Sequence, residues 1–173
     1  MAHVVFLRGV NVGGHRTFRP TILARQLKRF DAVNIGAAGT FVIRSPTSQA
    51  ELRAELLRRL PFETEVMICP GGELLKLVSG NPYGREPPIA GITRFMTVLA
   101  RRPRLFHALP FDLPSEGEWL VRIVSRENRY VFGQYRRHMK TIGYLGQMDR
   151  LFGMPATTRN WNTVNAIVKV LVA

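Results

Sequence analysis

The spacing of apolar residues over the first 70 positions predicts four strands and two helices. The predicted strands are residues 3–8, 33–35, 40–43 and 66–69. Between the first two strands, Leu23, Leu27 and Phe30 recur at i, i+4 and i+7, which is the spacing of one helix face. A capping box at residues 48–51 begins the second helix. The resulting order, β-α-β-β-α-β, is that of a ferredoxin-like split β-α-β unit.

The same patterns predict a second half of mixed helix and strand. Its predicted strands are residues 95–100, 119–125 and 130–135, with a loop at residues 110–117. The last two strands pair as a hairpin through a turn at Glu127 and Asn128. One helix ends at Gly153, and the last helix has Trp161 and Val164 on its buried face. We therefore predict an α+β fold of two halves packed as one compact unit: residues 1–82, ferredoxin-like, and residues 83–173, a sheet with C-terminal helices.

Length and composition fit a folded domain without disulfides. A chain of 173 residues buries enough surface for a core of its own. The single cysteine, Cys69, has no internal partner, so a cytoplasmic location is expected. No apolar run approaches the roughly 20 residues that a membrane-spanning helix needs, and no membrane partner is expected.

Charge is the unusual part of the composition. The formal net charge is +13, from 25 basic and 12 acidic residues. A positive field of that size attracts nucleic acid or phosphorylated small molecules. However, most of the basic residues are arginines spread along the whole chain, which codon composition in a GC-rich genome would also produce. Both interpretations stay open.

The loop after the first strand combines a cation, an amide and several glycines. These residues are Arg8, Asn11, Gly13 and Gly14. Backbone N–H groups and a guanidinium after a strand can bind an anion. The same residues can equally make only a tight turn from strand to helix.

A second candidate segment precedes the last helix. Thr157 or Thr158 is predicted to cap that helix, with Arg159 and Asn160 beside its first N–H groups. If this end lies near the first loop, one anion-binding site results, which we call the junction cluster. Its residues are Arg8, Asn11, Gly13, Gly14, Thr158, Arg159 and Asn160. The alternative is that the same groups only fasten the C-terminal segment to the first strand.

Basic residues of the second half form a candidate nucleic-acid surface, which we call the basic surface. Its residues are Arg101, Arg102, Arg104, Arg136, Arg137 and Lys140. Tyr130, Phe132 and Tyr135 could stack on bases. Strand alternation puts Tyr135 opposite the other two rings, so a place in the core is the simpler interpretation.

No sequence motif predicts catalysis. The four histidines, His3, His15, His107 and His138, lack the spacing of metal ligands, and no cofactor is predicted. Cys69 ends an apolar strand, as a small buried residue does. Two alternatives to anion binding therefore stay open: an enzyme of unknown reaction, and a structural or interaction module that forms a homodimer through a sheet edge.

Three segments resemble the uncharacterised bacterial family known as domain of unknown function 1697. They are residues 7–14, 80–83 and 155–161, in the order and separation that the family shows. The chain departs from the family pattern at residues 37–40, Ala-Ala-Gly-Thr in place of the family's Gln-Ser-Gly-Asn, and at residues 139–142, Met-Lys-Thr-Ile in place of a basic-Ser-Lys-Leu segment. The resemblance implies an α+β fold of two halves, the first ferredoxin-like, and implies no activity.

Overall fold

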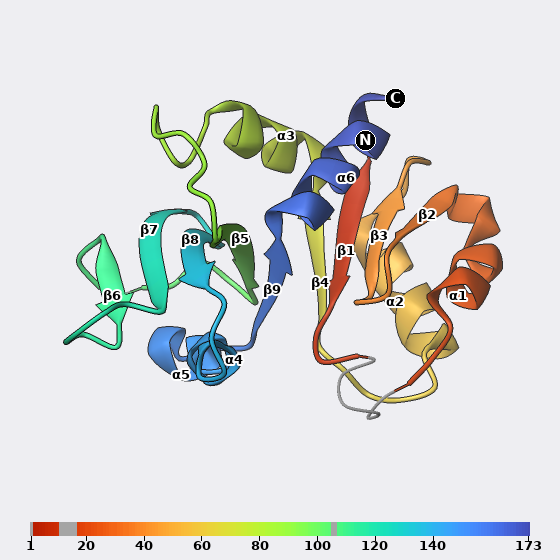
Figure 1. The fold of residues 1–173 in the computed structure, drawn as a ribbon. Coiled ribbons are helices and arrows are strands. Elements are labelled where there is room, and N and C mark those ends of the chain that lie inside the picture. Colours follow the sequence, from red (N-terminus) through yellow and green to blue (C-terminus); the bar gives the residue numbers. More distant parts are fainter. Residues whose placement is uncertain (1, 11–16, 105–106) are drawn as a thin grey trace. The chain divides into compact units, whose positions relative to one another are not determined.

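The computed structural model describes residues 2–10, 17–104 and 107–173. It divides into two compact units. The first unit contains the residues up to Ser79 together with Asn165–Ala173, and the second is Gly80–Val164. Figure 1 shows the elements of both units in chain order. Each unit has its own antiparallel sheet, which confirms the predicted α+β class.

The first unit has the predicted element order. Its elements are β1 (His3–Leu7), α1 (Pro20–Gln26), a 3-10 turn (Lys28–Phe30), β2 (Ala32–Ile35), β3 (Thr40–Ile43), α2 (Gln49–Arg59), β4 (Val66–Pro70) and α3 (Gly71–Ser79). The strand order is β2-β3-β1-β4, and β1 pairs antiparallel with both β3 and β4. This is the order of a split β-α-β unit, as the apolar spacing predicted.

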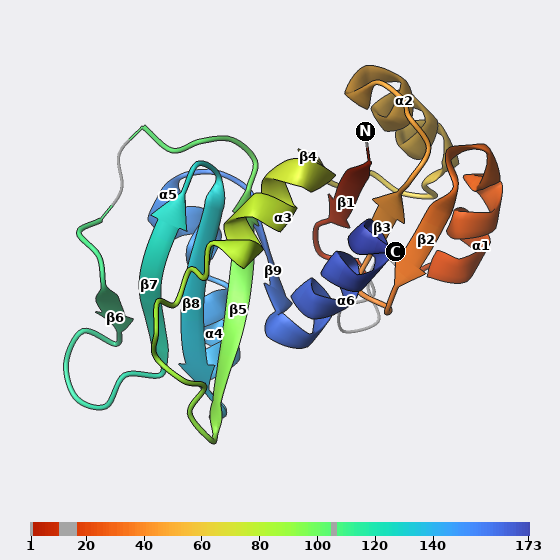
Figure 2. The same cartoon turned by 90° about the horizontal axis from the view of Figure 1, so that it is seen from above.

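One face of this sheet and the helices α1 and α2 form the first core. Figures 1 and 2 show both helices on the same side of the sheet. Leu23 from α1 and Leu56 from α2 pack there with Val5 from β1. The predicted cap of α2 is confirmed, because the Ser48 hydroxyl accepts a hydrogen bond from the Glu51 amide at 3.1 Å.

Glu55 is the acidic group that binds the two arginines at the end of α2. Its carboxylate accepts hydrogen bonds from Arg58 at 2.7 Å and from Arg59 at 3.0 Å, and Arg29 lies 3.8 Å away. The Glu55 side chain is only 8% exposed. Hydrogen bonds from Arg58 and then Arg59 lower the pKa of Glu55 to about 2, because they stabilise its ionised form.

The second unit contains a five-stranded sheet. Its elements are β5 (Ile92–Leu99), β6 (Phe111–Leu113), β7 (Val121–Glu127), β8 (Tyr130–Arg136), α4 (Thr141–Leu145), α5 (Met148–Phe152), β9 (Ala156–Asn160) and the start of α6 (Trp161–Val172). The order is β6-β7-β8-β5-β9, and every neighbouring pair is antiparallel. Gly153 ends α5 in the left-handed conformation, as predicted for the end of a helix.

Three details of the second unit correct the sequence prediction. Residues 110–117, predicted to be a loop, contain the short strand β6. Residues 156–160, predicted to lead into the last helix, form β9, because they extend the sheet beside β5. The helix predicted to end at Gly153 is two short helices, α4 and α5.

The centre of this sheet depends on a glycine. Gly133 of β8 pairs with Phe95 of β5. A Cβ atom at position 133 would collide with the Phe95 ring and lie 2.7 Å from the Arg122 carbonyl oxygen. On the opposite face, the buried Tyr83 hydroxyl lies 2.7 Å from the Phe95 oxygen and 2.8 Å from the Gly133 oxygen. The pairing of β5 with β8 is thus packed closely from both sides.

We expect Glu55→Gln to lower the melting temperature at pH 7 and to weaken its dependence on acid. Because the pKa of Glu55 is lowered in the folded chain, its stabilisation is present above about pH 4.5 and lost as the pH falls towards 2. Thermal denaturation between pH 7 and pH 2 measures both effects. Glu63→Gln, which removes an exposed carboxylate from the same unit, is the control. Equal effects of the two variants would contradict the role of Glu55.

We expect Gly133→Ala to destabilise the second unit by about 1–3 kcal/mol, because the added methyl group overpacks the sheet. Gly143→Ala is the matched control, since a Cβ atom there meets nothing within 4 Å. Chemical denaturation measures both variants. A neutral Gly133→Ala would show that Phe95 can move aside without cost.

Candidate functional site

The first part of the junction cluster lies at the end of β1. Asn11, Gly13 and Gly14 lie outside the described residues. The Arg8 amide donates a hydrogen bond to the Glu65 carbonyl at 3.1 Å. Arg8 also lines a hollow of about 490 Å³ together with Glu63 and Glu65. Two glutamates in the lining make this hollow mixed in charge and less favourable for an anion.

The second part of the junction cluster is a strand, and the predicted threonine cap of the last helix is wrong. Thr158 lies in β9, where its hydroxyl is 2.7 Å from the Thr97 hydroxyl on β5. The cap is Asn160, whose side-chain oxygen accepts a hydrogen bond from the Thr163 amide at 3.0 Å. Threonine and asparagine are both good caps, so pairing with β5 decided between them.

Arg159 is a buried cation whose local bonds go to its own strand. Its Nη1 atom donates to the Thr157 hydroxyl at 2.7 Å and to the Thr158 carbonyl at 3.0 Å. Burial lowers the pKa of Arg159 to about 10. These contacts agree with a structural role for Arg159. Because Arg8 and Arg159 belong to different units, the junction cluster stays a prediction.

The basic surface divides between the two ends of the second sheet. In the antiparallel pairing, Ile92 at the start of β5 lies opposite Arg136 at the end of β8. Residues 101–104 follow the other end of β5, so roughly 25 Å of strand separates them from Arg136 at about 3.3 Å per residue. Arg136 is also occupied, because it lies 3.2 Å from the Glu118 carboxylate and 4.2 Å from the centre of the Trp119 ring.

The rings proposed for base stacking belong to the core. Tyr130 and Phe132 are buried, on the face of β8 opposite Tyr135. Phe132 packs edge-on against Trp161, with ring centres 6.2 Å apart. A stacking role for Tyr130 and Phe132 would therefore need the sheet to open.

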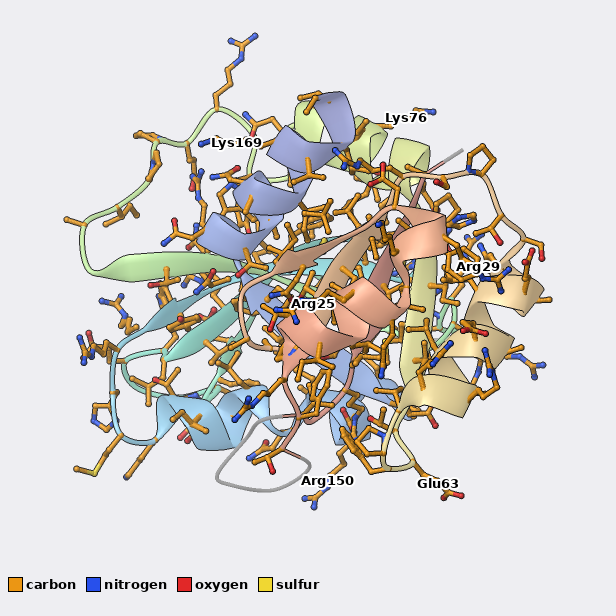
Figure 3. All side chains as sticks on the ribbon, turned by 90° about the vertical axis from the view of Figure 1, so that its right-hand side faces the viewer. Arg25, Arg29, Glu63, Lys76, Arg150 and Lys169 are labelled. Carbon is orange, nitrogen blue, oxygen red and sulfur yellow. The ribbon has the colours of Figure 1, made fainter. Side chains whose placement is uncertain are left out.

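One end of the sheet gathers a cluster of arginines around a hollow of about 640 Å³, which we call the arginine groove. Arg101, Arg102 and Arg104 come from the segment after β5, and Arg150 comes from α5. The floor of the groove is largely apolar, formed by residues 151–154. Figure 3 shows Arg150 extending away from the ribbon.

Strand pairing explains why these distant segments meet. Leu99 at the end of β5 lies opposite Ala156 at the start of β9. The Ala100 amide then donates a hydrogen bond to the Pro155 carbonyl at 2.9 Å. The chain that leaves β5 is thus held beside the chain that links α5 to β9. Sequence reasoning missed Arg150, because this pairing requires β9, which the sequence did not predict.

The arginine groove is electrostatically uncompensated. Among residues 2–10, 17–104 and 107–173, none forms an ion pair or a side-chain hydrogen bond with the guanidinium of Arg101, Arg102, Arg104 or Arg150. The described residues that line the groove include no carboxylate. Other arginines of the same unit are paired, as Arg122 is with Asp112 at 2.7 Å. The groove is therefore a concentration of unpaired positive charge over an apolar floor.

The described part of the chain contains neither a metal-binding cluster nor a membrane-spanning helix. No group of three or more histidine, cysteine, aspartate or glutamate residues in it could hold a metal ion. None of its helices is long and apolar enough to cross a membrane. Cys69 is buried and forms no disulfide.

The fold is that of an α+β protein with two antiparallel sheets, and its candidate site is a hollow lined by arginines. The chain belongs to the family described as "Protein of unknown function (DUF1697)", whose model matches residues 1–108. This confirms the resemblance seen in the sequence.

A solved structure supports the fold. The chain is similar over 98% of both chains, with a TM-score of 0.62 and 15% identity, to the structure of the conserved bacterial protein SP0830 from Streptococcus pneumoniae. At this identity the likeness concerns the fold alone. No curated protein matches the chain.

We expect Asn160→Ala to destabilise α6 by about 1 kcal/mol, because it removes the cap of the helix. Asn162→Ala, two residues further along the chain and exposed, is the control and should be neutral or slightly stabilising. Chemical denaturation compares them. If the two variants lose equal stability, Asn160 is not the residue that caps α6.

Proposed function

We propose that this protein binds phosphate-bearing ligands and that the arginine groove is the binding site. The observation that carries the proposal is the gathering of Arg101, Arg102, Arg104 and Arg150 around one hollow without a carboxylate among the described lining residues. A guanidinium presents two parallel N–H donors to two phosphate oxygens, so several arginines can hold several oxygens at once.

The shape of the groove supports a ligand with both a charged and a less polar part. Phe152 and Met154 are buried in the floor, and Leu151 is half-buried there. Arginine guanidiniums at the rim would hold phosphate, while sugar or base atoms would cover the apolar floor. Nucleotides and single-stranded nucleic acid share this chemistry.

The lining of the groove favours binding over catalysis. Its described residues are arginines, aliphatic or aromatic residues and a glycine. None of these carries the hydroxyl, thiol, imidazole or carboxylate that a nucleophile or general base requires. An enzyme of unknown reaction and a structural module or homodimer remain the alternatives to this proposal.

We expect the variant Arg101→Gln/Arg104→Gln/Arg150→Gln to bind a fluorescent single-stranded oligonucleotide at least about tenfold more weakly, because each lost phosphate contact weakens binding. The control is Arg19→Gln/Arg25→Gln/Arg85→Gln, which removes three exposed arginines that form no ion pair with any described residue. Both variants have the same net charge of +10, from +13 minus 3. Fluorescence anisotropy measures the affinities, and circular dichroism checks the fold.

A salt series sharpens this test. If the three arginines contact phosphates of a single strand, the slope of log affinity against log salt should fall by about 2 in the groove variant, at about 0.7 per contact. Equal losses in both triple variants would show that only net charge matters and would contradict the groove. Competition by ATP and by inorganic phosphate distinguishes a small ligand from a polymer.

The junction cluster is kept as a second proposed location for the same chemistry. Arg8→Gln in the oligonucleotide assay tests it independently of the groove, because Arg8 lies in the other unit. A cytoplasmic location belongs to this proposal as well. It is supported by the single cysteine, Cys69, which is buried and free, because a fold without disulfides suits a reducing compartment.

A further inference from the structure

The opposite end of the second sheet contains another hollow, of about 610 Å³. Thr93 of β5 and Tyr135 of β8 are paired neighbours in the sheet and form one wall. The segment from Arg137 to Leu145, which includes α4, forms the rest. Ligand pockets typically enclose about 300–1,000 Å³ and combine apolar walls with a few polar groups. This hollow has that size and that composition.

Two apolar side chains of this hollow are unusually exposed. Met139 is 89% exposed and Ile142 is 80% exposed, more than the other large apolar side chains of the described chain. Leu145 and the Tyr135 ring continue the apolar surface into the hollow. A ligand that covers these side chains would remove apolar area from water, which favours binding by about 25 cal/mol per Å².

The loop that presents these side chains is held in place. The Thr141 hydroxyl donates a hydrogen bond to the Arg136 carbonyl at 2.6 Å, and Thr141 is buried. The Lys140 amide donates to Nδ1 of His138 at 3.0 Å. Because Nδ1 accepts that bond, the proton of a neutral His138 ring is on Nε2, where it is a donor.

The polar groups of the hollow select an anion of low charge. The Arg137 guanidinium has no ion-pair or hydrogen-bond partner among the residues that the structure describes. No described lining residue is a carboxylate. One guanidinium matches one carboxylate through two parallel hydrogen bonds. The arginine groove, in contrast, has four guanidiniums around one hollow.

We infer that this hollow binds a small carboxylate with an apolar body, such as a medium-chain fatty acid. The carboxylate pairs with Arg137, and the apolar body covers Met139, Ile142 and Leu145. This inference does not depend on the arginine groove, which lies at the other end of the sheet and has a different charge. It adds a second ligand class to a family without an assigned function.

The test is calorimetric titration of the full chain with decanoate and with 1-decanol, below the concentration at which decanoate forms micelles. We expect Arg137→Gln to weaken decanoate binding about tenfold and to leave decanol binding unchanged, because only the carboxylate uses the guanidinium. Ile142→Ser should weaken both ligands. Arg85→Gln and Ile89→Ser, at exposed positions outside the hollow, are the matched controls and should change neither.

Several results would overturn this inference. One is equal affinity of the unaltered chain for decanoate and decanol, and another is no saturable decanoate binding up to about 1 mM. A third is binding to phosphatidylglycerol vesicles that requires Met139 and Ile142 while free decanoate does not bind. That result would assign the exposed loop to a membrane surface instead. All variants change exposed side chains, and circular dichroism checks that each one folds.

Discussion

The antiparallel pairing of β5 with β8 is the constraint from which the chemistry of the second unit follows. Ile92 lies opposite Arg136 and Val98 opposite Tyr130, so the two strands run past each other over almost their whole length. The basic segments that follow these strands must then leave the sheet at opposite ends. The close packing around Gly133 resists any shift in this register, because a shift by one residue would place side chains on the wrong face.

This separation gives the two ends different chemistry. At one end, β9 continues the sheet and brings α5 with Arg150 beside residues 101–104. At the other end, the chain after β8 turns into α4 and exposes Met139 and Ile142 near Arg137, which has no ion-pair partner among the described residues. The first end therefore favours a ligand with several negative charges. The second favours a singly charged, partly apolar ligand.

Much of the fold follows from local sequence signals, and the parts that do not are set by pairing between distant segments. Leu23, Leu27 and Phe30 predict a helix by their spacing, and all three are buried in the first core, although α1 ends at Gln26 and Phe30 lies in the 3-10 turn that follows. Residues 156–160 carry no apolar alternation, and their strand exists because β5 offers an unpaired edge. The arginine groove depends on that strand. For this reason the sequence indicated Arg101, Arg102 and Arg104 but not Arg150.

The excess of arginine does not by itself point to a site, and the proposed groove is supported instead by how the arginines are distributed. With 25 basic and 12 acidic residues, at least 13 cations must lack a carboxylate of their own if each acid takes one. Codon composition would leave such residues scattered, as Arg19, Arg25 and Arg85 are along the surface. Glu55, in contrast, forms ion pairs with two arginines of its own helix, Arg58 and Arg59. Four arginines line one hollow that has no carboxylate among its described lining residues, so their like charges repel one another, and a bound phosphate would relieve that repulsion.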